Sequence, residues 1–225
     1  MLRTTITGAT AMLLLAGCAA DAGRPVTPSS VPVAAAEAPV PPVTGWRSFA
    51  SPADQARLAD LPQRFAQARA ALPARLAKAI RAEGPLLDPA IAAPLPQLPP
   101  GSYRCRLVRL GGAARFRTFP SDFCYVDAAD DRLAFTKQTG STLPEGYVYS
   151  DTATNLVFLG TMRVAGEKGG KPYGADPARD LVGLVTRVAP FRWRLVLAHA
   201  GRGADIDLYE LVPVPPSAPD GRPGS

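Results

Sequence analysis

The sequence predicts a mainly β protein with an N-terminal helical segment, in which about eight strands form a small antiparallel β-barrel or sandwich. From Gly101 onward, apolar and polar residues alternate in short runs, which is the period of a half-buried strand. Turn-forming clusters such as GSTLPEG separate the runs, and the absence of helix-length patterns between them argues against parallel βαβ units. The expected strands are Ser102–Arg109, Phe116–Val126, Arg132–Gln138, Gly146–Asp151, Asn155–Val164, Leu181–Val188, Phe191–Ala198 and Ile206–Val212.

The N-terminal residues have the layout of a bacterial signal peptide that ends at a lipid-attachment site. Arg3 supplies positive charge, residues 6–15 form a short apolar run, and Ala16 and Gly17 are small. The run is too short for a transmembrane helix, which needs about 20 apolar residues. The tetrapeptide that ends at Cys18 resembles the bacterial lipobox, whose cysteine receives a diacylglycerol and becomes the new N-terminus. Cys18 is therefore expected to anchor the protein in a membrane through its lipid.

Composition divides the chain into five segments. The stretch after the lipobox is rich in proline and alanine and poor in aromatic residues, so it cannot bury enough apolar surface to become ordered. It is expected to be a disordered tether that holds the folded part away from the membrane. The predicted segments are the signal peptide (1–17), the lipidated cysteine and tether (18–45), a helical arm with a proline-rich connection (46–100), the antiparallel β domain (101–213) and a disordered tail (214–225).

The helical arm shows both start and stop signals. Ser51 suits an N-cap and Pro52 suits the first helical position, after which leucines recur at spacings of three and four. Pro62 and Pro73 should divide or kink the helix, and Gly84 followed by proline should end it. The opposite face is rich in arginine. This face is either solvated while the leucines pack on the β domain, or it contacts an anionic membrane or a partner protein.

Two of the three cysteines are expected to form a structural disulfide. With Cys18 lipidated, Cys105 and Cys124 remain, and they lie in an oxidising compartment where disulfides persist. A hairpin centred near Ala114 would place them roughly opposite each other. A closed loop of about 20 residues stabilises a fold by roughly 3 kcal/mol in the chain-entropy model. The alternative is a redox or metal pair, but neither a CxxC spacing nor nearby histidines support it.

A cluster of polar and aromatic residues around one expected hairpin is a candidate ligand site. A binding site needs a few convergent polar groups on an apolar wall, and the segment FTKQTGSTLPEGYVYS provides both. The same residues could instead form a polar turn. The candidate ligand-binding residues are Lys137, Thr139, Ser141, Tyr147 and Tyr149.

Catalytic, metal and nucleic-acid functions have weaker support. An envelope hydrolase would use Ser141 with His199, the one histidine, but the serine lacks the glycine pattern of a nucleophile elbow. No metal site or cofactor motif is predicted. The net charge of +6 would suit nucleic acid. The arginines are scattered, however, and export separates the protein from nucleic acid, so acidic glycans or lipid headgroups are the more accessible partners.

Period-two alternation also predicts which side chains face the barrel interior. In the segment FRWRLVLA, Trp193 should face inward, whereas Arg194 should face outward and be solvated. The expected inward-facing residues are Tyr103, Leu107, Phe116, Leu133, Phe135, Phe158, Trp193, Leu195 and Leu208.

Several segments resemble one uncharacterised family of bacterial exported proteins. They are PPGSYRCRLVRLG, FTKQTGS, VFLG, RWRLVL and DLYELVP. Over about residues 46 to 213, the chain resembles the family called domain of unknown function 4893. This resemblance implies where the domain begins and ends, but it carries no information about an activity. A Gly-x-Tyr opening strand and an eight-strand meander are also similar to lipocalin-like barrels, although Tyr103 stands where lipocalins have tryptophan.

These observations predict a lipid-anchored periplasmic binding or envelope-structural module. The expected partners are the membrane, through the lipid anchor, and a small apolar or acidic envelope ligand, with no cofactor and no nucleic acid. The alternatives are the hydrolase described above and a scaffold that binds a partner through the basic helix. Ala19, rather than aspartate, follows the lipidated cysteine, so the outer membrane is the expected location by analogy with other lipoproteins.

Overall fold

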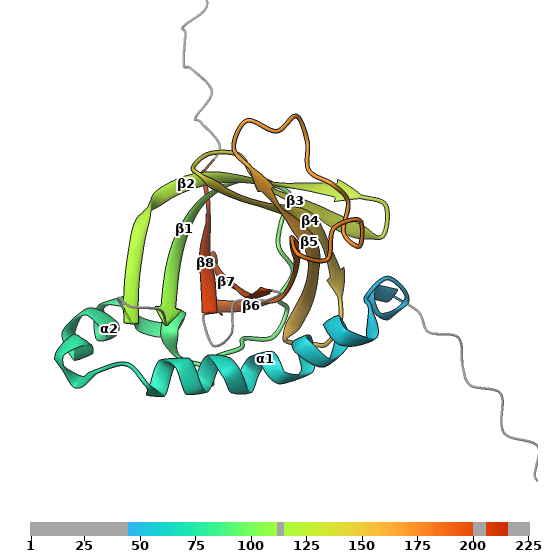
Figure 1. Ribbon diagram of the computed structural model, residues 1–225. Helices are drawn as coiled ribbons and strands as arrows, with labels where there is room; N and C mark the ends of the chain where they lie inside the picture. The colour runs from blue at the N-terminus through green and yellow to red at the C-terminus, as the bar shows by residue number, and fades with distance from the viewer. Residues whose placement is uncertain (1–44, 112–114, 200–205, 216–225) are drawn as a thin grey trace, which may run out of the picture. The chain divides into compact units, whose positions relative to one another are not determined.

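Eight antiparallel strands follow one another around a closed barrel, in which β1 pairs with both β2 and β8 (Figure 1). This confirms the mainly β class and selects a barrel over a sandwich. Each strand lies beside its neighbours in sequence, as short connections require. The strands are β1 (Gly101–Gly111), β2 (Arg115–Ala129), β3 (Arg132–Lys137), β4 (Thr142–Ser150), β5 (Asn155–Val164), β6 (Asp180–Ala189), β7 (Arg192–His199) and β8 (Ile206–Pro213).

The computed structural model describes residues 45–111, 115–199 and 206–215. The signal peptide, Cys18 and nearly all of the tether lie outside the described residues, as does most of the predicted tail. The eight expected strands are confirmed, and β5 has the expected bounds. In contrast, β4 begins four residues earlier than expected. Leu143, which we assigned to a turn, is a buried residue of that strand.

A helical arm precedes the barrel and packs on its outer wall. It consists of η1 (Gly45–Ser48), α1 (Pro52–Ala70), η2 (Ala74–Leu76), α2 (Ala77–Glu83) and η3 (Gly84–Leu87). The Ser51 hydroxyl accepts a hydrogen bond from the Asp54 amide, which caps α1 as expected. None of the helices in the described part of the chain is long and apolar enough to span a membrane.

The expectation that Pro62 divides the helix is wrong, because α1 continues through this residue to Ala70. Proline removes one backbone hydrogen bond from a helix interior. Leu61 and Phe65 on either side of Pro62 are buried against the barrel, and this tertiary packing keeps the helix intact. The second expected break is confirmed, since α1 ends before Pro73.

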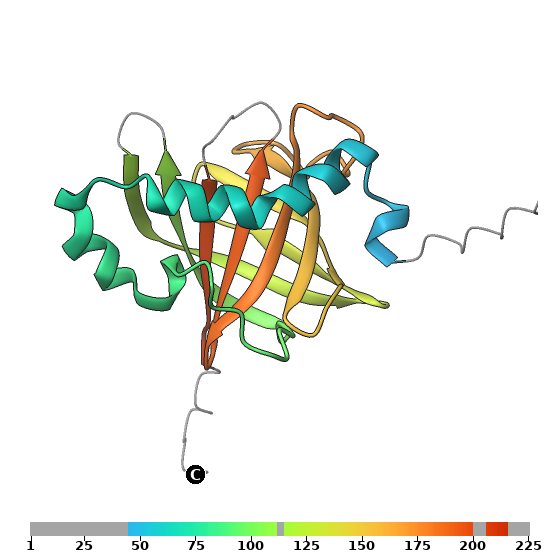
Figure 2. The same ribbon diagram turned by 90° about the horizontal axis from the view of Figure 1, so that it is seen from below.

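The arm and the barrel wall share an apolar layer, the outer core. Figure 2 shows α1 running across β6, β7 and β8, and it contacts β1 as well. Phe116, which we expected inside the barrel, packs against the outer core because the register shift between Arg106 and Val108 places an extra residue in β2 and reverses its alternation before that point. Leu208, also expected inside, lies in the outer core because both faces of the wall are buried beneath the arm. Apolar alternation cannot distinguish the faces of a strand that is covered on both sides.

The apolar part of the barrel interior, the inner core, is filled by large side chains. Tyr103 and Trp193 meet edge to face with ring centroids 6.3 Å apart, and Phe135 and Phe158 do so at 5.8 Å. These residues were expected inside, together with Leu107 and Leu195, which are also buried there. Leu133 is partly buried against the same cluster. The inward positions were therefore largely predictable from the alternation.

The proline-rich connection between η3 and β1 packs against one end of the inner core. The Tyr103 hydroxyl donates to the Pro99 carbonyl oxygen over 2.5 Å, and Trp193 Nε1 donates to that of Pro96 over 3.0 Å. Leu98 is buried in the inner core. This segment, which the sequence presented only as a connector, thus contributes a core residue and two hydrogen-bond acceptors.

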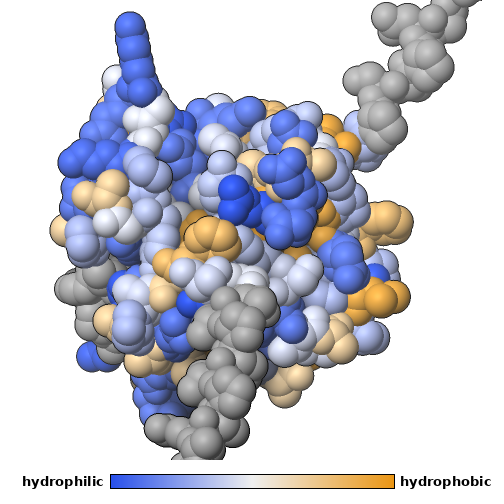
Figure 3. Space-filling model, turned by 90° about the vertical axis from the view of Figure 1, so that its right-hand side faces the viewer, coloured by the Kyte–Doolittle hydropathy of each residue, from blue (hydrophilic) through white to orange (hydrophobic). Residues whose placement is uncertain are grey.

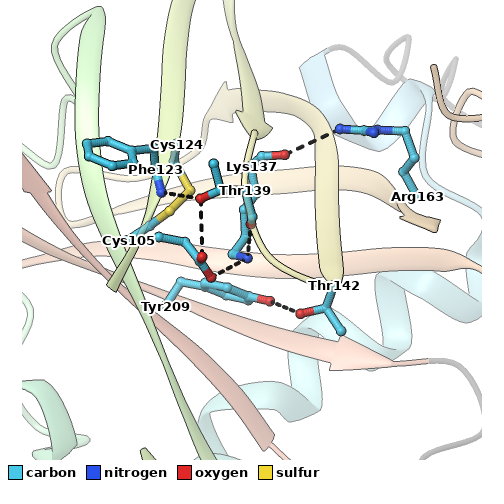
Figure 4. The surroundings of a disulfide bond; sticks show 9 residues. Cys105, Phe123, Cys124, Lys137, Thr139, Thr142, Arg163 and Tyr209 are labelled. Carbon is cyan, nitrogen blue, oxygen red and sulfur yellow. Dashed lines mark hydrogen bonds and ion pairs between the residues drawn. A yellow bond between two sulfur atoms is a disulfide. The ribbon is translucent and has the colours of Figure 1, made fainter. Parts of the chain in front are cut away.

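The expected disulfide joins Cys105 to Cys124 between β1 and β2 (Figure 4). The cysteines are diagonal neighbours rather than directly opposite, because Cys105 pairs with Asp122 and Cys124 pairs with Tyr103. The ladder near the turn pairs Gly111 with Arg115, which would leave Cys105 opposite Ser121, and the register shift between residues 106 and 108 brings Cys105 opposite Asp122 instead. Both cysteines are buried in the inner core.

The expectation that Arg194 is solvated is wrong. Its side chain does face outward from the barrel, on the opposite side of β7 from Trp193, but the helical arm covers it and leaves it 3% exposed. Its guanidinium group donates to the carbonyl oxygens of Leu86, Asp88 and Ile91 over 3.1, 2.7 and 2.9 Å. Arg194 therefore ties η3 and the following segment to the barrel wall.

Candidate ligand-binding site

The candidate ligand residues separate into two places because strand alternation sends them to opposite faces of the wall. Lys137 pairs with Cys124 and faces the barrel interior. Tyr147 and Tyr149 face outward on β4, where they pair with Leu159 and Val157 of the outer surface. One cluster in the sequence thus becomes two sites in the structure.

The first site lies inside the barrel, at the end where β3 turns into β4, and we call it the mouth pocket. Its volume is about 330 Å³, and Lys137 and Ser141 are among its lining residues. Lys137 Nζ lies 2.6 Å from a carboxylate oxygen of Asp122 and donates to the Thr139 carbonyl oxygen over 2.5 Å (Figure 4). The Thr139 hydroxyl donates to the same carboxylate over 3.1 Å. Three candidate residues therefore do converge here.

The polar groups of the mouth pocket are largely engaged with each other. Lys137 is 1% exposed and held by the Asp122 carboxylate. Arg109, which also lines the pocket, forms a two-pronged pair with Asp207 at 2.5 and 2.7 Å. Burial raises the pKa of Tyr209 to about 12, so its hydroxyl stays protonated beside that of Thr142, 3.5 Å away. Such a saturated network mainly holds the strand ends together.

The second site, the outer pocket, is a hollow of about 500 Å³ on the outer surface of β3, β4 and β5. Phe49, directly after η1, and the loop between β5 and β6 form its other walls, and both η1 and this loop lie on this side of the barrel (Figure 1). Four aromatic side chains line it, and the charged lining residues come from three different segments. The lining residues used below are Phe49, Arg132, Glu145, Tyr147, Tyr149, Lys171 and Tyr173.

Phe49 reaches the outer pocket because η1 is fixed to the end of β4. Trp46 is buried and donates through Nε1 to a carboxylate oxygen of Asp151 over 2.8 Å. This contact positions the Phe49 ring 5.4 Å from that of Tyr149, centroid to centroid. Phe49 remains 54% exposed, so its ring has a free surface at the rim of the pocket.

The loop between β5 and β6 is held over the pocket by two polar contacts. The Gly170 amide donates to Glu145 over 2.6 Å, and a side chain at this position would collide with the same carboxylate. Tyr173 donates its hydroxyl to the buried carboxylate of Asp54 at the start of α1. Burial, and then this hydrogen bond, raise the pKa of Tyr173 to about 12, so the hydroxyl remains a donor at neutral pH.

Arg132 is the cation at the centre of the aromatic lining. Its guanidinium carbon lies 4.1 Å from the ring centroid of Tyr147 and 5.7 Å from those of Phe49 and Tyr149. Among the described residues no carboxylate lies within ion-pair distance of Arg132, and its buried Nε has no hydrogen-bond partner. By contrast, Glu145 is already neutralised by Arg163 at 2.8 Å. The pocket therefore offers a positive group without a counter-charge.

The residues proposed for hydrolysis do not form a catalytic arrangement in the described part of the chain. Ser141 lines the mouth pocket, beside the already paired Lys137. His199 ends β7, opposite Leu181 in β6, and its side chain lies outside the described residues. No group of three or more potential metal ligands is found among the described residues.

Sequence reasoning missed Phe49, Arg132 and Tyr173 as pocket residues. They are separated by between 41 and 124 positions, and only the barrel topology and the loop hydrogen bonds bring them together. Arg132 opens β3 directly after an acidic turn, which made it look like an ordinary solvated charge. A tyrosine within a glycine-rich loop was the one available signal, since a large aromatic residue there calls for a packing partner.

Comparisons with known proteins agree with the resemblance seen in the sequence. Residues 46–211 match the family described as Domain of unknown function (DUF4893). No curated protein and no solved structure matches the chain. The family match spans the helical arm and almost the whole barrel, including both pockets, and covers well over half of the chain. The protein therefore belongs to the DUF4893 family.

Proposed function

We propose that the protein is a lipid-anchored binding module of the bacterial envelope, and that its ligand occupies the outer pocket. The observation that carries the proposal is Arg132, a cation without a counter-charge set among exposed aromatic rings in a hollow of about 500 Å³. Pockets for small ligands commonly measure 300–1,000 Å³ and combine apolar walls with a few polar groups.

The barrel interior is the less suitable place for a ligand. Lipocalin-like barrels can hold ligands in their lumen. Here Tyr103, Phe135, Phe158 and Trp193 occupy the apolar half of the interior. The mouth pocket at the other end is crossed by the Lys137–Asp122 ion pair. A ligand in the outer pocket displaces neither the inner core nor this network.

The lining of the outer pocket favours a ligand that combines an acidic group with a flat apolar body. A guanidinium group binds carboxylate or phosphate oxygens through two parallel hydrogen bonds. Tyr147 and Phe49, which are 40% and 54% exposed, offer ring surfaces on which a flat group can stack. Lys171 adds a second positive charge at the rim, although Asp176 lies 3.5 Å from it.

Binding of a flat aromatic carboxylate should depend on Arg132. With 2-naphthoate as the probe, Arg132→Gln should weaken binding at least tenfold, because a hydrogen bond to a charged group contributes about 1.5–3 kcal/mol and tenfold corresponds to about 1.4 kcal/mol. Neutral 2-naphthamide should bind correspondingly more weakly to the native protein. Isothermal titration calorimetry measures both affinities.

The matched control is Arg104→Gln, which removes an exposed arginine on β1 that does not line the pocket. It should leave the affinity for 2-naphthoate unchanged. Equal losses in the two variants would mean that only the net charge of the protein attracts the probe. If 2-naphthoate did not bind measurably to the native protein, flat aromatic carboxylates would be excluded as the ligand class of the outer pocket.

The membrane anchor is tested separately at Cys18. Cys18→Ala should abolish incorporation of a labelled fatty acid and release the protein from the membrane fraction, because the thiol that receives the diacylglycerol is gone. Cys105→Ala is the control, because it removes a cysteine outside the lipobox. This variant should still incorporate the labelled fatty acid. An unlabelled native protein would contradict the anchor.

The face shown in Figure 3 bears on how the module meets the membrane. Apolar residues there are scattered between hydrophilic ones and do not form one continuous patch. Extensive membrane insertion through a surface requires a continuous apolar area. This face therefore suits a module held by a lipid and a tether, rather than one that lies in the bilayer.

A further inference from the structure

A row of polar side chains lies beneath the helical arm, where the wall is otherwise apolar. Asn155 on β5 pairs with Thr186 on β6, and Thr186 pairs with Arg194 on β7, so the three lie side by side across neighbouring strands. Thr186 is 6% exposed and Arg194 is 3% exposed. Polar groups so deeply buried normally have hydrogen-bond partners.

Two atoms of this row have no such partner. The terminal nitrogens of Arg194 bind three backbone carbonyl oxygens, but its Nε is buried and unpartnered among the described residues. The hydroxyl oxygen of Thr186 is also buried and has no hydrogen-bond partner among the described residues. Both residues line a cavity of about 140 Å³ between α1 and the wall, which we call the covered cavity. It shares no lining residue with the outer pocket.

Arg194 also lacks a carboxylate in direct contact with it. Among the described residues no carboxylate lies within ion-pair distance of its guanidinium group, and the ring of Phe65, 4.8 Å away, offers only the partial negative charge of its face. Burial lowers the pKa of Arg194 to about 10 although the Asp88 carboxylate acts in the opposite direction, and the group is still charged at neutral pH. A buried charge that no opposite charge contacts directly is unfavourable.

We propose that the covered cavity binds a small monovalent anion, held by Arg194 Nε and the Thr186 hydroxyl. Thr186 and Arg194 are cross-strand neighbours that both line the cavity, so one acceptor placed there would receive a hydrogen bond from each, and Asn155 lines the cavity beside them. An anion supplies a negative charge in contact with the guanidinium group as well as the missing acceptor, whereas a water molecule supplies the acceptor alone. The site is independent of the function proposed for the outer pocket.

The remaining walls of the cavity define the kind of anion. Leu61, Phe65, Leu184 and Val196 are apolar and leave no further charged group for a divalent anion. A doubly charged ion would therefore lose most of its hydration without replacement. Chloride and a short-chain carboxylate such as acetate share the required chemistry, since both are monovalent acceptors that tolerate apolar neighbours.

Crystals of the mature protein soaked in sodium bromide test the site directly. Bromide should give an anomalous peak in the covered cavity, within about 3.5 Å of Arg194 Nε and Thr186 Oγ1. Acetate added with bromide should remove the peak if both ions share the site. A water molecule there, with bromide confined to the surface, would refute the proposal.

Solution measurements distinguish a built site from an adventitious ion. The thermal midpoint of the native protein should rise and saturate with acetate or chloride but not with sulfate at equal ionic strength. Thr186→Val, which preserves the shape of the side chain, should weaken the response to acetate at least tenfold. Thr118→Val, an exposed position on β2, is the control and should respond like the native protein. A bromide peak that Thr186→Val does not change, without any stabilisation by the ion, would show an adventitious ion only and would overturn the proposal.

Discussion

Replacing Trp193 with alanine should lower the free energy of unfolding by about 3–5 kcal/mol, the usual range for a large aromatic residue removed from a core. Its indole is 3% exposed, packs edge to face on Tyr103 and donates to the Pro96 carbonyl oxygen. The substitution would leave a cavity in the inner core and an unsatisfied carbonyl group in the proline-rich connection. Because domain stabilities are about 5–15 kcal/mol, this loss is a large share of the total.

Chemical denaturation followed by circular dichroism measures the effect for Trp193→Ala. Trp193→Phe is the informative companion variant, since it retains an aromatic ring against Tyr103 while removing the hydrogen bond to Pro96. It should fall between the native protein and the alanine variant. A loss below about 1 kcal/mol for Trp193→Ala would mean that the inner core is not packed as described.

Replacing Arg194 with alanine should also be strongly destabilising, by about 3 kcal/mol. The substitution deprives three backbone carbonyl oxygens of their donor, and each buried acceptor left without one costs about 1–3 kcal/mol, less where water can reach it. The packing on Phe65 is lost as well. Arg194→Lys should recover little of the loss, because one ammonium group cannot reproduce the planar fork of a guanidinium.

Arg104→Ala is the matched control for Arg194→Ala. Arg104 also faces outward from a barrel strand, but the helical arm does not cover it. Its replacement should change stability by no more than about 0.5 kcal/mol, as is usual for exposed positions. Urea melts of the two variants under the same conditions give the comparison. Equal and small effects would mean that the helical arm does not dock over β7.

The contrast between these two arginines shows where the sequence is informative. Alternation along β7 correctly places Trp193 inside and Arg194 outside the barrel. It does not reveal that a helix covers the outside, because that depends on contacts between segments more than 100 positions apart. For the same reason Leu208 was assigned to the wrong core, whereas Phe116 was misassigned because a register shift in β2 reverses the alternation.

The candidate site was predictable only in part. Turn signals identified the hairpin between β3 and β4, and the polar residues at its tip do meet inside the barrel mouth. Tyr147 and Tyr149 lie on the other face of the wall, and the partners that form a pocket with them come from the residue after η1, from β3 and from a distant loop. Local spacing carries no information about such contacts.

A crystal structure of the mature protein with 2-naphthoate tests the central claim most directly. We expect the carboxylate of the probe at the guanidinium group of Arg132 and its ring against Tyr147 and Phe49, with the inner core unchanged. A probe bound in the mouth pocket or in the barrel interior would contradict the claim that the outer pocket is the ligand site of this protein.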